Sequence, residues 1–354
     1  MKLVCNISLN KYSRFFGKDL YYIDKPIPLM GHIAFGIIDR GTNVIQIRPS
    51  TLCFHDCIFC SVDAGPNSKN RRNEYIVDEY WLKDWVEEIS RIKGKGIEAL
   101  IDGVGEPITH PKILKIISLL RQIKEIDNIV METHGGSLSL ILAKQLEKAG
   151  LNRINLSIDT LNPEKAKILT NSYWYDVSKV LEVAEKIIKE TNLDIILTPV
   201  IVPGYNEEDM KQIINWAKNN KLGKKSNLPT GVLIQKFEVH HFGRKPNKVK
   251  SWSWDKFYSY LKKLEAETNY RLIVRPDELG FRKTTKIEVP YNINEKVKIN
   301  IIGAGWLRSE YLGVDKNCLR VITVISPRLE LKDNTEIYGK IIRNKDNIFV
   351  AKLL

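Results

Sequence analysis

The sequence predicts an α/β fold with a parallel sheet, followed by a small all-β barrel. Two observations support this prediction. Short β-branched runs alternate with amphipathic helical patterns over residues 40–275, and the helical patterns stop after Pro276. Such alternation is typical of a parallel sheet with right-handed crossovers. Six units could form an open doubly wound sheet or an incomplete barrel, and in both cases a site is expected at the carboxyl ends of the strands.

Local patterns assign the elements of the α/β part. Residues 33–38 and 44–47 flank an Arg-Gly-Thr-Asn turn, which predicts a hairpin leading into the parallel sheet. Helix starts are predicted where a cap residue or a proline precedes apolar positions at helical spacing. These starts are Asp78, Pro111, Asn162–Pro163 and Val177. The six predicted strands are 44–47, 97–101, 128–131, 153–158, 193–202 and 231–237.

The C-terminal part changes to short strand-like runs. Short strands at this spacing favour a small β-barrel, and they are predicted at 286–289, 296–302, 319–325, 336–342 and 348–352. The sequence therefore predicts an N-terminal extension with a β-hairpin (1–39), an α/β domain (40–283) and a basic barrel (284–354).

Composition excludes several classes of protein. The 354 residues are 43% hydrophobic and 27% charged, which is typical of a globular chain and not of a disordered one. No apolar run approaches about 18 residues, so no transmembrane helix is expected. The N-terminus lacks the apolar core of a signal peptide. Three of the five cysteines fall within eight residues, which favours a metal or redox site in the cytoplasm over a secreted disulfide scaffold.

The net charge of +13 is unevenly distributed. Residues 281–354 hold 14 Lys and Arg against 8 Asp and Glu. An excess of this kind fits a polyanionic partner, although Lys-rich solvated faces are the simpler explanation.

Three cysteines follow the first predicted strand. Cys53, Cys57 and Cys60 are close enough along the chain to bind one metal centre. A [4Fe–4S] cluster usually takes four cysteines, so three would leave one iron open to another ligand. One alternative is structural zinc with His55 as a ligand, but no second ligand pair follows. Buried core cysteines are the other alternative, which polar His55 and Asp56 disfavour.

The spacing C-x3-C-x2-C, with aromatic Phe59 before the last cysteine, resembles the radical S-adenosylmethionine (SAM) superfamily. The resemblance covers residues 40–240 and implies an incomplete (β/α)6 barrel. It also implies a [4Fe–4S] cluster on Cys53, Cys57 and Cys60, with SAM bound at the open iron. Reductive cleavage of SAM would give a 5′-deoxyadenosyl radical that abstracts hydrogen from a substrate. A one-electron donor such as ferredoxin or flavodoxin is an implied partner.

Further motifs lie at the ends of the predicted strands. Residues 103–107 (Gly-Val-Gly-Glu-Pro) resemble the segment that binds the SAM amino group, although an ordinary turn is possible. Residues 155–160 resemble an element near the SAM ribose, unless Asp159 only caps the next helix. Residues 198–206 resemble the segment that contacts adenine. The implied SAM-binding residues are Phe59, Gly103, Gly105, Glu106, Ser157, Asp159, Val202 and Gly204.

Candidate substrate residues are basic side chains near the expected site and one histidine. His134 stands where relatives often have asparagine, after the third strand. Arg71 and Arg72 follow the cysteine segment, and Arg244 and Lys245 follow the sixth strand. These positions suit a substrate that carries phosphate groups.

The barrel resembles the TRAM RNA-binding barrel, or an OB-like barrel, of radical SAM enzymes that modify tRNA. Its candidate RNA contacts are Trp306, Arg308, Tyr311, Arg343 and Phe349. We therefore expect a radical SAM enzyme that modifies RNA, most of all tRNA, with no membrane partner. The alternatives are a radical SAM enzyme acting on a protein side chain or small metabolite, and a non-catalytic iron–sulfur protein that binds nucleic acid.

Overall fold

The computed structural model describes residues 7–327 and 329–354. The chain forms two compact units, each assembled from separate stretches of sequence. The first unit comprises Met1–Leu52, Ser68–Asp127 and Lys283–Leu354, and the second comprises Cys53–Asn67 and Asn128–Arg282.

The first unit contains the predicted hairpin and the start of the parallel sheet. Strand β3 (Gly36–Asp39) pairs antiparallel with β4 (Val44–Arg48), which pairs parallel with β6 (Ile97–Ile101). The Asp78 side chain accepts the amide hydrogens of residues 80 and 81 and so caps α1 (Glu79–Lys93), as predicted. The shorter α2 (Ile113–Leu120) follows η1 (Pro107–Thr109).

A second sheet in this unit was not predicted. Strand β1 (Asn10–Phe15) pairs antiparallel with β2 (Lys18–Ile23), and β2 pairs parallel with β5 (Asn73–Val77). Charged and polar residues fill much of β1, whose side chains are mostly exposed. Its sequence therefore lacks the apolar alternation from which strands are recognised.

The C-terminal residues form a closed five-stranded barrel, which confirms the predicted all-β barrel. Buried and exposed side chains alternate along β15, with Ile337 and Ile341 facing inward. Its strands, in the order β12-β13-β14-β16-β15, are β12 (Lys296–Ala304), β13 (Glu310–Asp315), β14 (Val321–Ile325), β15 (Glu336–Arg343) and β16 (Val350–Leu353).

Two details of the barrel prediction were wrong. Residues 286–289 form no strand, and β13 was missed. The sequence of β13 has acidic residues at both ends and Gly313 inside, which weaken a strand pattern. The structure requires this glycine, because a Cβ atom there would lie 2.4 Å from Cγ2 of Ile299.

The expected base-stacking surface of the barrel was also wrong. Trp306, Tyr311 and Phe349 are only 4%, 9% and 0% exposed. Tyr311 and Phe349 belong to the barrel core, so their rings are not available to nucleic-acid bases. Arg308 and Arg343 are exposed, as an RNA contact requires.

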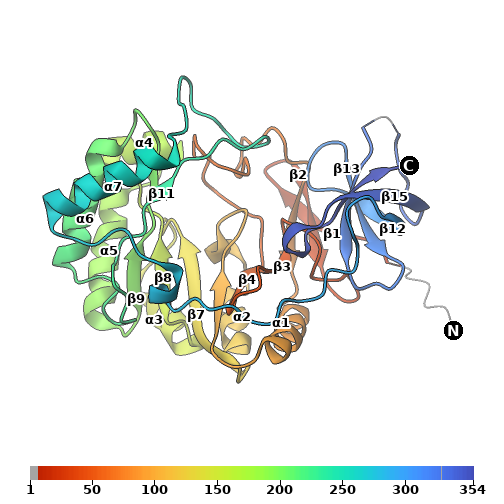
Figure 1. The fold of residues 1–354 in the computed structure, drawn as a ribbon, viewed down its shortest axis with the longest axis horizontal. Helices are drawn as coiled ribbons and strands as arrows, with labels where there is room; N and C mark the ends of the chain where they lie inside the picture. Colours follow the sequence, from red (N-terminus) through yellow and green to blue (C-terminus); the bar gives the residue numbers. More distant parts are fainter. Residues whose placement is uncertain (1–6, 328) are drawn as a thin grey trace. The chain divides into compact units, whose positions relative to one another are not determined.

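The second unit contains the rest of the parallel strands. The helices α5 and α6 both contact β9, and Figure 1 shows them on one side of β8 and β9. Strand β8 pairs parallel with its neighbours β7 and β9. The strands are β7 (Ile126–Thr133), β8 (Arg153–Leu156), β9 (Asp194–Leu197), β10 (Val200–Ile201) and β11 (Gln235–Lys236). The helices are α3 (Leu140–Ala149), α4 (Pro163–Thr170), α5 (Val177–Glu190), α6 (Met210–Asn219) and α7 (Trp254–Thr268).

The predicted strand 193–202 is divided in two. Thr198 and Pro199 separate β9 from β10, because proline has no amide hydrogen for the ladder. Short 3₁₀ turns complete the description: η2 (Glu207–Asp209), η3 (Pro276–Leu279) and η4 (Lys345–Asn347). Among the described residues, no helix has both the length and the apolar character needed to span a membrane.

Candidate functional site

The three clustered cysteines lie in a loop of the second unit, residues 53–67, which we call the cysteine loop. None of the three forms a disulfide, and Cys53 and Cys57 are buried while Cys60 is partly exposed. Burial raises the pKa of the Cys57 thiol, and the neighbouring Cys53 and Cys60 raise it further. Across residues 7–327 and 329–354, no group of three or more His, Cys, Asp or Glu side chains is arranged so that it could hold a metal ion.

The end of α4 holds the cysteine loop. The amide of Asp56 donates to the carbonyl oxygen of Thr170 at 3.1 Å, and the amide of Ile58 donates to that of Leu169 at 2.9 Å. The last carbonyls of a helix have no partner within the helix. The loop satisfies two of them, which fixes the backbone on both sides of Cys57.

Arg244 also binds this loop. Its Nε atom donates to Asp63 at 2.8 Å, and an Nη atom donates to Asp56 at 3.2 Å. Further hydrogen bonds reach the carbonyl oxygens of Cys57 and Ala64. The guanidinium of Arg244 thus has a structural role in the loop that carries the cysteines, and its predicted substrate contact stays a prediction. Lys245 is exposed, and its substrate role stays a prediction.

His134 lies beside the cysteine loop. Its Nδ1 atom is 3.1 Å from the carbonyl oxygen of Ser157, which can only accept, so Nδ1 carries the hydrogen. Its Nε2 atom lies 3.9 Å from Sγ of Cys57. The hydroxyl of Tyr175 donates to the His134 carbonyl at 2.9 Å. The histidine thus connects the end of β8 to a cysteine.

An aromatic group next to His134 was missed. The ring of His55 stacks on Trp174 with centroids 4.7 Å apart, and it meets the Tyr175 ring edge-on at 5.2 Å. Its Nδ1 atom lies 3.3 Å from Oγ of Ser172, and burial lowers the pKa of His55 to about 3. The aromatic run at 173–175, directly after α4, is the signal that sequence analysis could have used.

Asp159 connects the segment that follows β8 to the start of β10. Its Oδ1 atom accepts the amide hydrogen of Val200 at 2.8 Å. Burial raises the pKa of Asp159, and the nearby His134 partly lowers it. The alternative role as a helix cap was wrong, because Asn162 caps α4.

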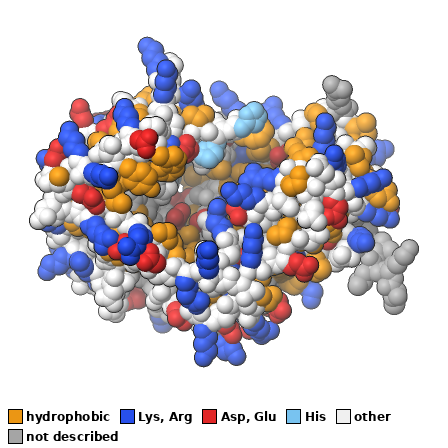
Figure 2. Space-filling view, viewed as in Figure 1, with side chains coloured by type: hydrophobic (Ala, Val, Ile, Leu, Met, Phe, Trp, Pro, Cys, Tyr) orange, Lys and Arg blue, Asp and Glu red, His pale blue; other side chains and the backbone are white. Residues whose placement is uncertain are grey.

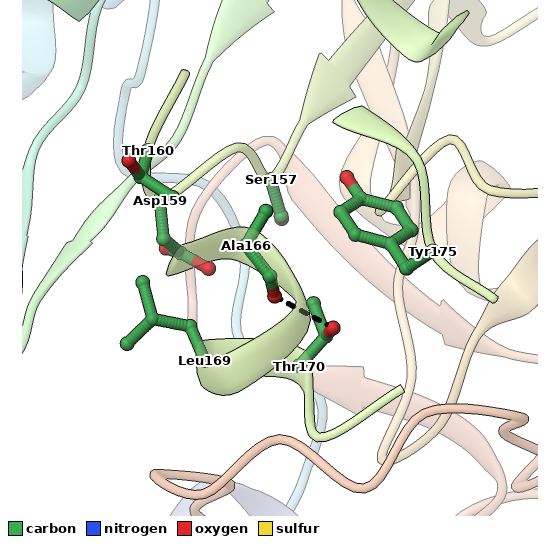
Figure 3. Close-up of a pocket in the computed structure, with 7 residues that line it drawn as sticks. All are labelled: Ser157, Asp159, Thr160, Ala166, Leu169, Thr170 and Tyr175. Carbon is green, nitrogen blue, oxygen red and sulfur yellow. Dashed lines mark hydrogen bonds between the residues drawn. The ribbon is translucent and has the colours of Figure 1, made fainter. Parts of the chain in front are cut away.

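A small cavity lies beside this carboxylate. Its free volume is about 10 Å³, which is roughly the room of one water molecule. Figure 3 shows the Asp159 carboxylate directed toward α4. The cavity is lined by Ser157, Asp159, Thr160, Ala166, Leu169, Thr170 and Tyr175.

Three predicted SAM-binding residues, of which Val202 and Gly204 were expected near adenine, differ in burial. Phe59 and Val202 pack in one apolar cluster with Cys57, whereas Gly204 is exposed at φ +84°. Asn206, which is fully buried, was not predicted as a site residue. Its side chain accepts the amide hydrogen of Val202 and donates to the carbonyl of Asp159, both at 2.8 Å.

The Gly103–Glu106 segment lies in the first unit. A Cβ atom on Gly105 would lie 2.4 Å from the carbonyl oxygen of Thr51, so only glycine allows the two backbones to approach. The amide of Glu106 donates to the carbonyl of Leu52 at 2.7 Å, and Glu106 is 4% exposed. The segment is therefore held against the residues that directly precede Cys53.

Arg71 and Arg72 differ in burial. Arg71 forms an ion pair with Glu74 at 3.1 Å, and both side chains are almost completely buried. The prediction of a substrate contact was wrong for Arg71, because its guanidinium lies inside the first unit. Arg72 is exposed, and its substrate role stays a prediction.

Comparisons with known proteins agree with the cysteine motif. An uncharacterised protein of Methanocaldococcus jannaschii is 35% identical, over 99% of this chain and 84% of that protein. A GTP 3′,8-cyclase of Syntrophomonas wolfei is 29% identical, over 55% of this chain. The chain spans only 58% of that cyclase.

Solved structures also resemble this chain. A structure described as native anSMEcpe with bound AdoMet has a TM-score of 0.49 at 16% identity, covering 77% of this chain and 74% of its own. A structure of TYW1 with a lysine-pyruvate adduct has a TM-score of 0.46 at 17% identity, covering 70% of this chain and 80% of its own.

The family model described as the radical SAM superfamily matches residues 47–217. This match includes the three cysteines, the Gly103–Glu106 segment, the last residues of β4 and the strands β5 to β10. The predicted α/β fold class with an incomplete barrel is confirmed. The chain belongs to the radical SAM superfamily.

Proposed function

We propose that this radical SAM enzyme binds its [4Fe–4S] cluster through Cys53, Cys57 and Cys60. We also propose that its substrate contains a nucleotide. RNA, and tRNA in particular, is the first candidate. The observation that supports the cluster site is the cysteine loop, which carries three cysteines without disulfides and whose backbone is bonded to α4 and Arg244. When bound, the cluster supplies the electron that cleaves SAM and starts radical chemistry. Thiolate donors in one loop fit such a cluster.

The remaining site residues are proposed to hold SAM. The buried Glu106 carboxylate suits the SAM ammonium group, because a charge-assisted hydrogen bond is strong in a buried site. Ser157 and Asp159 at the end of β8 supply polar groups for the ribose. Phe59 and Val202 supply an apolar surface near Cys57 for adenine. The family requires an electron donor, for which we propose ferredoxin or flavodoxin.

Substitution of the cysteines tests the cluster assignment. Reconstituted protein with SAM and dithionite should form 5′-deoxyadenosine, and Cys57→Ala should lower that rate at least about 100-fold, since a missing ligand removes the cluster. Ser61→Ala is the matched control, because this exposed residue lies in the same loop. Normal cluster content and cleavage in Cys57→Ala would contradict the assignment.

Positive charge supports RNA as the substrate. Residues 281–354 carry an excess of six basic over acidic residues. Lys and Arg side chains are scattered over the face shown in Figure 2, among fewer Asp and Glu. Because the barrel aromatics are buried, Arg308 and Arg343 would bind phosphates without base stacking.

A free nucleotide is the second candidate. The similarity to a GTP 3′,8-cyclase favours it, because that protein by its name acts on GTP. A nucleotide and an RNA share the same phosphate and base chemistry, so basic residues near the site are compatible with both.

Salt-dependent binding separates the two substrates. If RNA is the substrate, the double variant Arg308→Gln/Arg343→Gln should bind tRNA about tenfold more weakly. The slope of log affinity against log salt should fall by about 2, one unit for each lost phosphate contact. GTP-dependent consumption of SAM without any effect of this variant would instead support the free nucleotide.

A further inference from the structure

Arg71 connects three distant segments of the first unit. One guanidinium nitrogen donates to the carbonyl of Thr51 at 2.9 Å, and the other donates to the carbonyl of Val104. The guanidinium carbon lies 4.7 Å from the centre of the Trp306 ring. Thr51 precedes the cysteine loop, Val104 lies inside the Gly103–Glu106 segment, and Trp306 lies between strands β12 and β13 of the barrel.

The backbone around Arg71 is joined to the same turn of the barrel. The amide of Arg72 donates to the carbonyl of Trp306 at 2.8 Å, and the amide of Arg308 donates to that of Asn70 at 3.2 Å. The Asn73 side chain donates to the carbonyl of Gly305 at 2.7 Å. The β12–β13 turn therefore fixes the Arg71 backbone as well as its side chain.

We propose that Arg71 is a positioning residue that couples the C-terminal barrel to the Gly103–Glu106 segment, so that SAM affinity depends on Trp306. This inference rests on the proposed SAM-binding role of that segment. The barrel would then have a role in cofactor binding that is separate from any contact with substrate.

The buried guanidinium of Arg71 holds two backbone carbonyl groups in fixed positions. A planar guanidinium can donate to two carbonyls in fixed directions, whereas a lysine ammonium has no such plane. The hydrogen bond to Val104 orients the peptide that enters Gly105, where a Cβ atom would lie only 2.4 Å from the Thr51 carbonyl oxygen. Trp306 covers the guanidinium face and is 4% exposed, so it keeps water away from these bonds. A shift of the turn would therefore move the Val104 carbonyl.

Hydrogen–deuterium exchange tests the coupling without any cofactor. In Arg71→Lys and in the milder Trp306→Phe, the amide of Glu106 should exchange about tenfold and about threefold faster than in the unaltered full-length protein. That amide is normally bonded to Leu52. Amides of β8 in the second unit should not change, which excludes general unfolding. Arg72→Lys, at an exposed neighbouring position, is the matched control.

SAM affinity of the reconstituted protein provides the second measurement. Equilibrium dialysis should give a dissociation constant about tenfold higher for Arg71→Lys and about threefold higher for Trp306→Phe, with iron content unchanged. Unchanged exchange at Glu106 in both variants would overturn the coupling. Faster exchange with unchanged SAM affinity would overturn the dependence of SAM binding on Trp306, and it would indicate that SAM binds elsewhere. Loss of SAM cleavage in the unaltered protein would refute the proposed function while leaving the exchange result valid.

Discussion

His134 Nε2 lies 3.9 Å from Cys57 Sγ, while Nδ1 of the same ring donates to the carbonyl of Ser157. This histidine therefore bridges the cysteine loop and the end of β8. Its position also affects Asp159, whose pKa it lowers against the effect of burial. The two contacts make His134 a residue that can position the polar groups proposed to bind SAM.

Two substitutions at His134 separate its contacts. His134→Leu removes the donor to Ser157, and we expect about tenfold weaker SAM binding by equilibrium dialysis with unchanged iron content. His134→Asn keeps an amide donor for the same carbonyl, so its affinity should stay within about threefold of the unaltered protein. Equal losses in both variants would mean that the contact with Ser157 is not what matters.

Arg244 should determine whether the cysteine loop holds its shape. Arg244→Lys keeps the charge but cannot reach Asp56, Asp63 and the loop carbonyls together. Since the lysine would lose several of these partly buried contacts, we expect a lower melting temperature and less than half the normal iron content.

The matched control for Arg244 is its exposed neighbour. Lys245→Ala should change the free energy of unfolding by less than about 0.5 kcal/mol and leave the iron content normal. The structural role of Arg244 would be refuted if its lysine variant reconstituted a full cluster.

Helices and strands could be predicted from the sequence more accurately than the contacts between side chains. Strand β6 agrees with its predicted bounds, because a buried parallel strand is an uninterrupted apolar run. The contacts that Arg71 and Arg244 make with the fold were not predicted, because most of their partners lie far away along the chain. Arg244 binds Asp56 across 188 residues, and no local pattern indicates such a pair. From the sequence alone, an arginine near a motif that contacts a substrate therefore cannot be distinguished from one that contacts other residues of the protein.

The cysteine motif was predictable because its ligands are close together in sequence. Trp174 and Asn206 were not predicted as site residues, and His55 was considered only as a zinc ligand, since their contacts form between segments that are far apart in sequence. The barrel aromatics were mistaken for a surface because burial depends on the closure of the barrel. Phe349 is 0% exposed in the closed structure.

Glu106 should contribute to SAM affinity through its charge. Glu106→Gln preserves the size of the side chain and removes the charge that suits an ammonium group. A charged hydrogen bond contributes about 1.5–3 kcal/mol, so SAM affinity should fall at least about tenfold. Isothermal titration calorimetry on reconstituted protein measures this. Glu88→Gln, whose side chain is 67% exposed on α1, is the control and should bind SAM normally.

His32 should make the stability of the fold depend on pH. Burial, and to a lesser degree Arg48, lowers the pKa of His32 from 6.5 to about 3. Between these values the unfolded chain binds a proton that the folded chain does not, so stability falls as pH decreases below 6.5. From pH 7 to pH 5 this histidine should remove about 2 kcal/mol from the free energy of unfolding. Burial also lowers the pKa of His55 to about 3 and of His110 to about 4, so these two residues add losses of the same sign. Urea unfolding of cluster-free protein should therefore show a larger total loss in the unaltered chain and in the exposed control His241→Gln. The His32→Gln variant should lose about 2 kcal/mol less than the unaltered chain over the same pH range, and an equal loss in both would contradict the neutral state of His32.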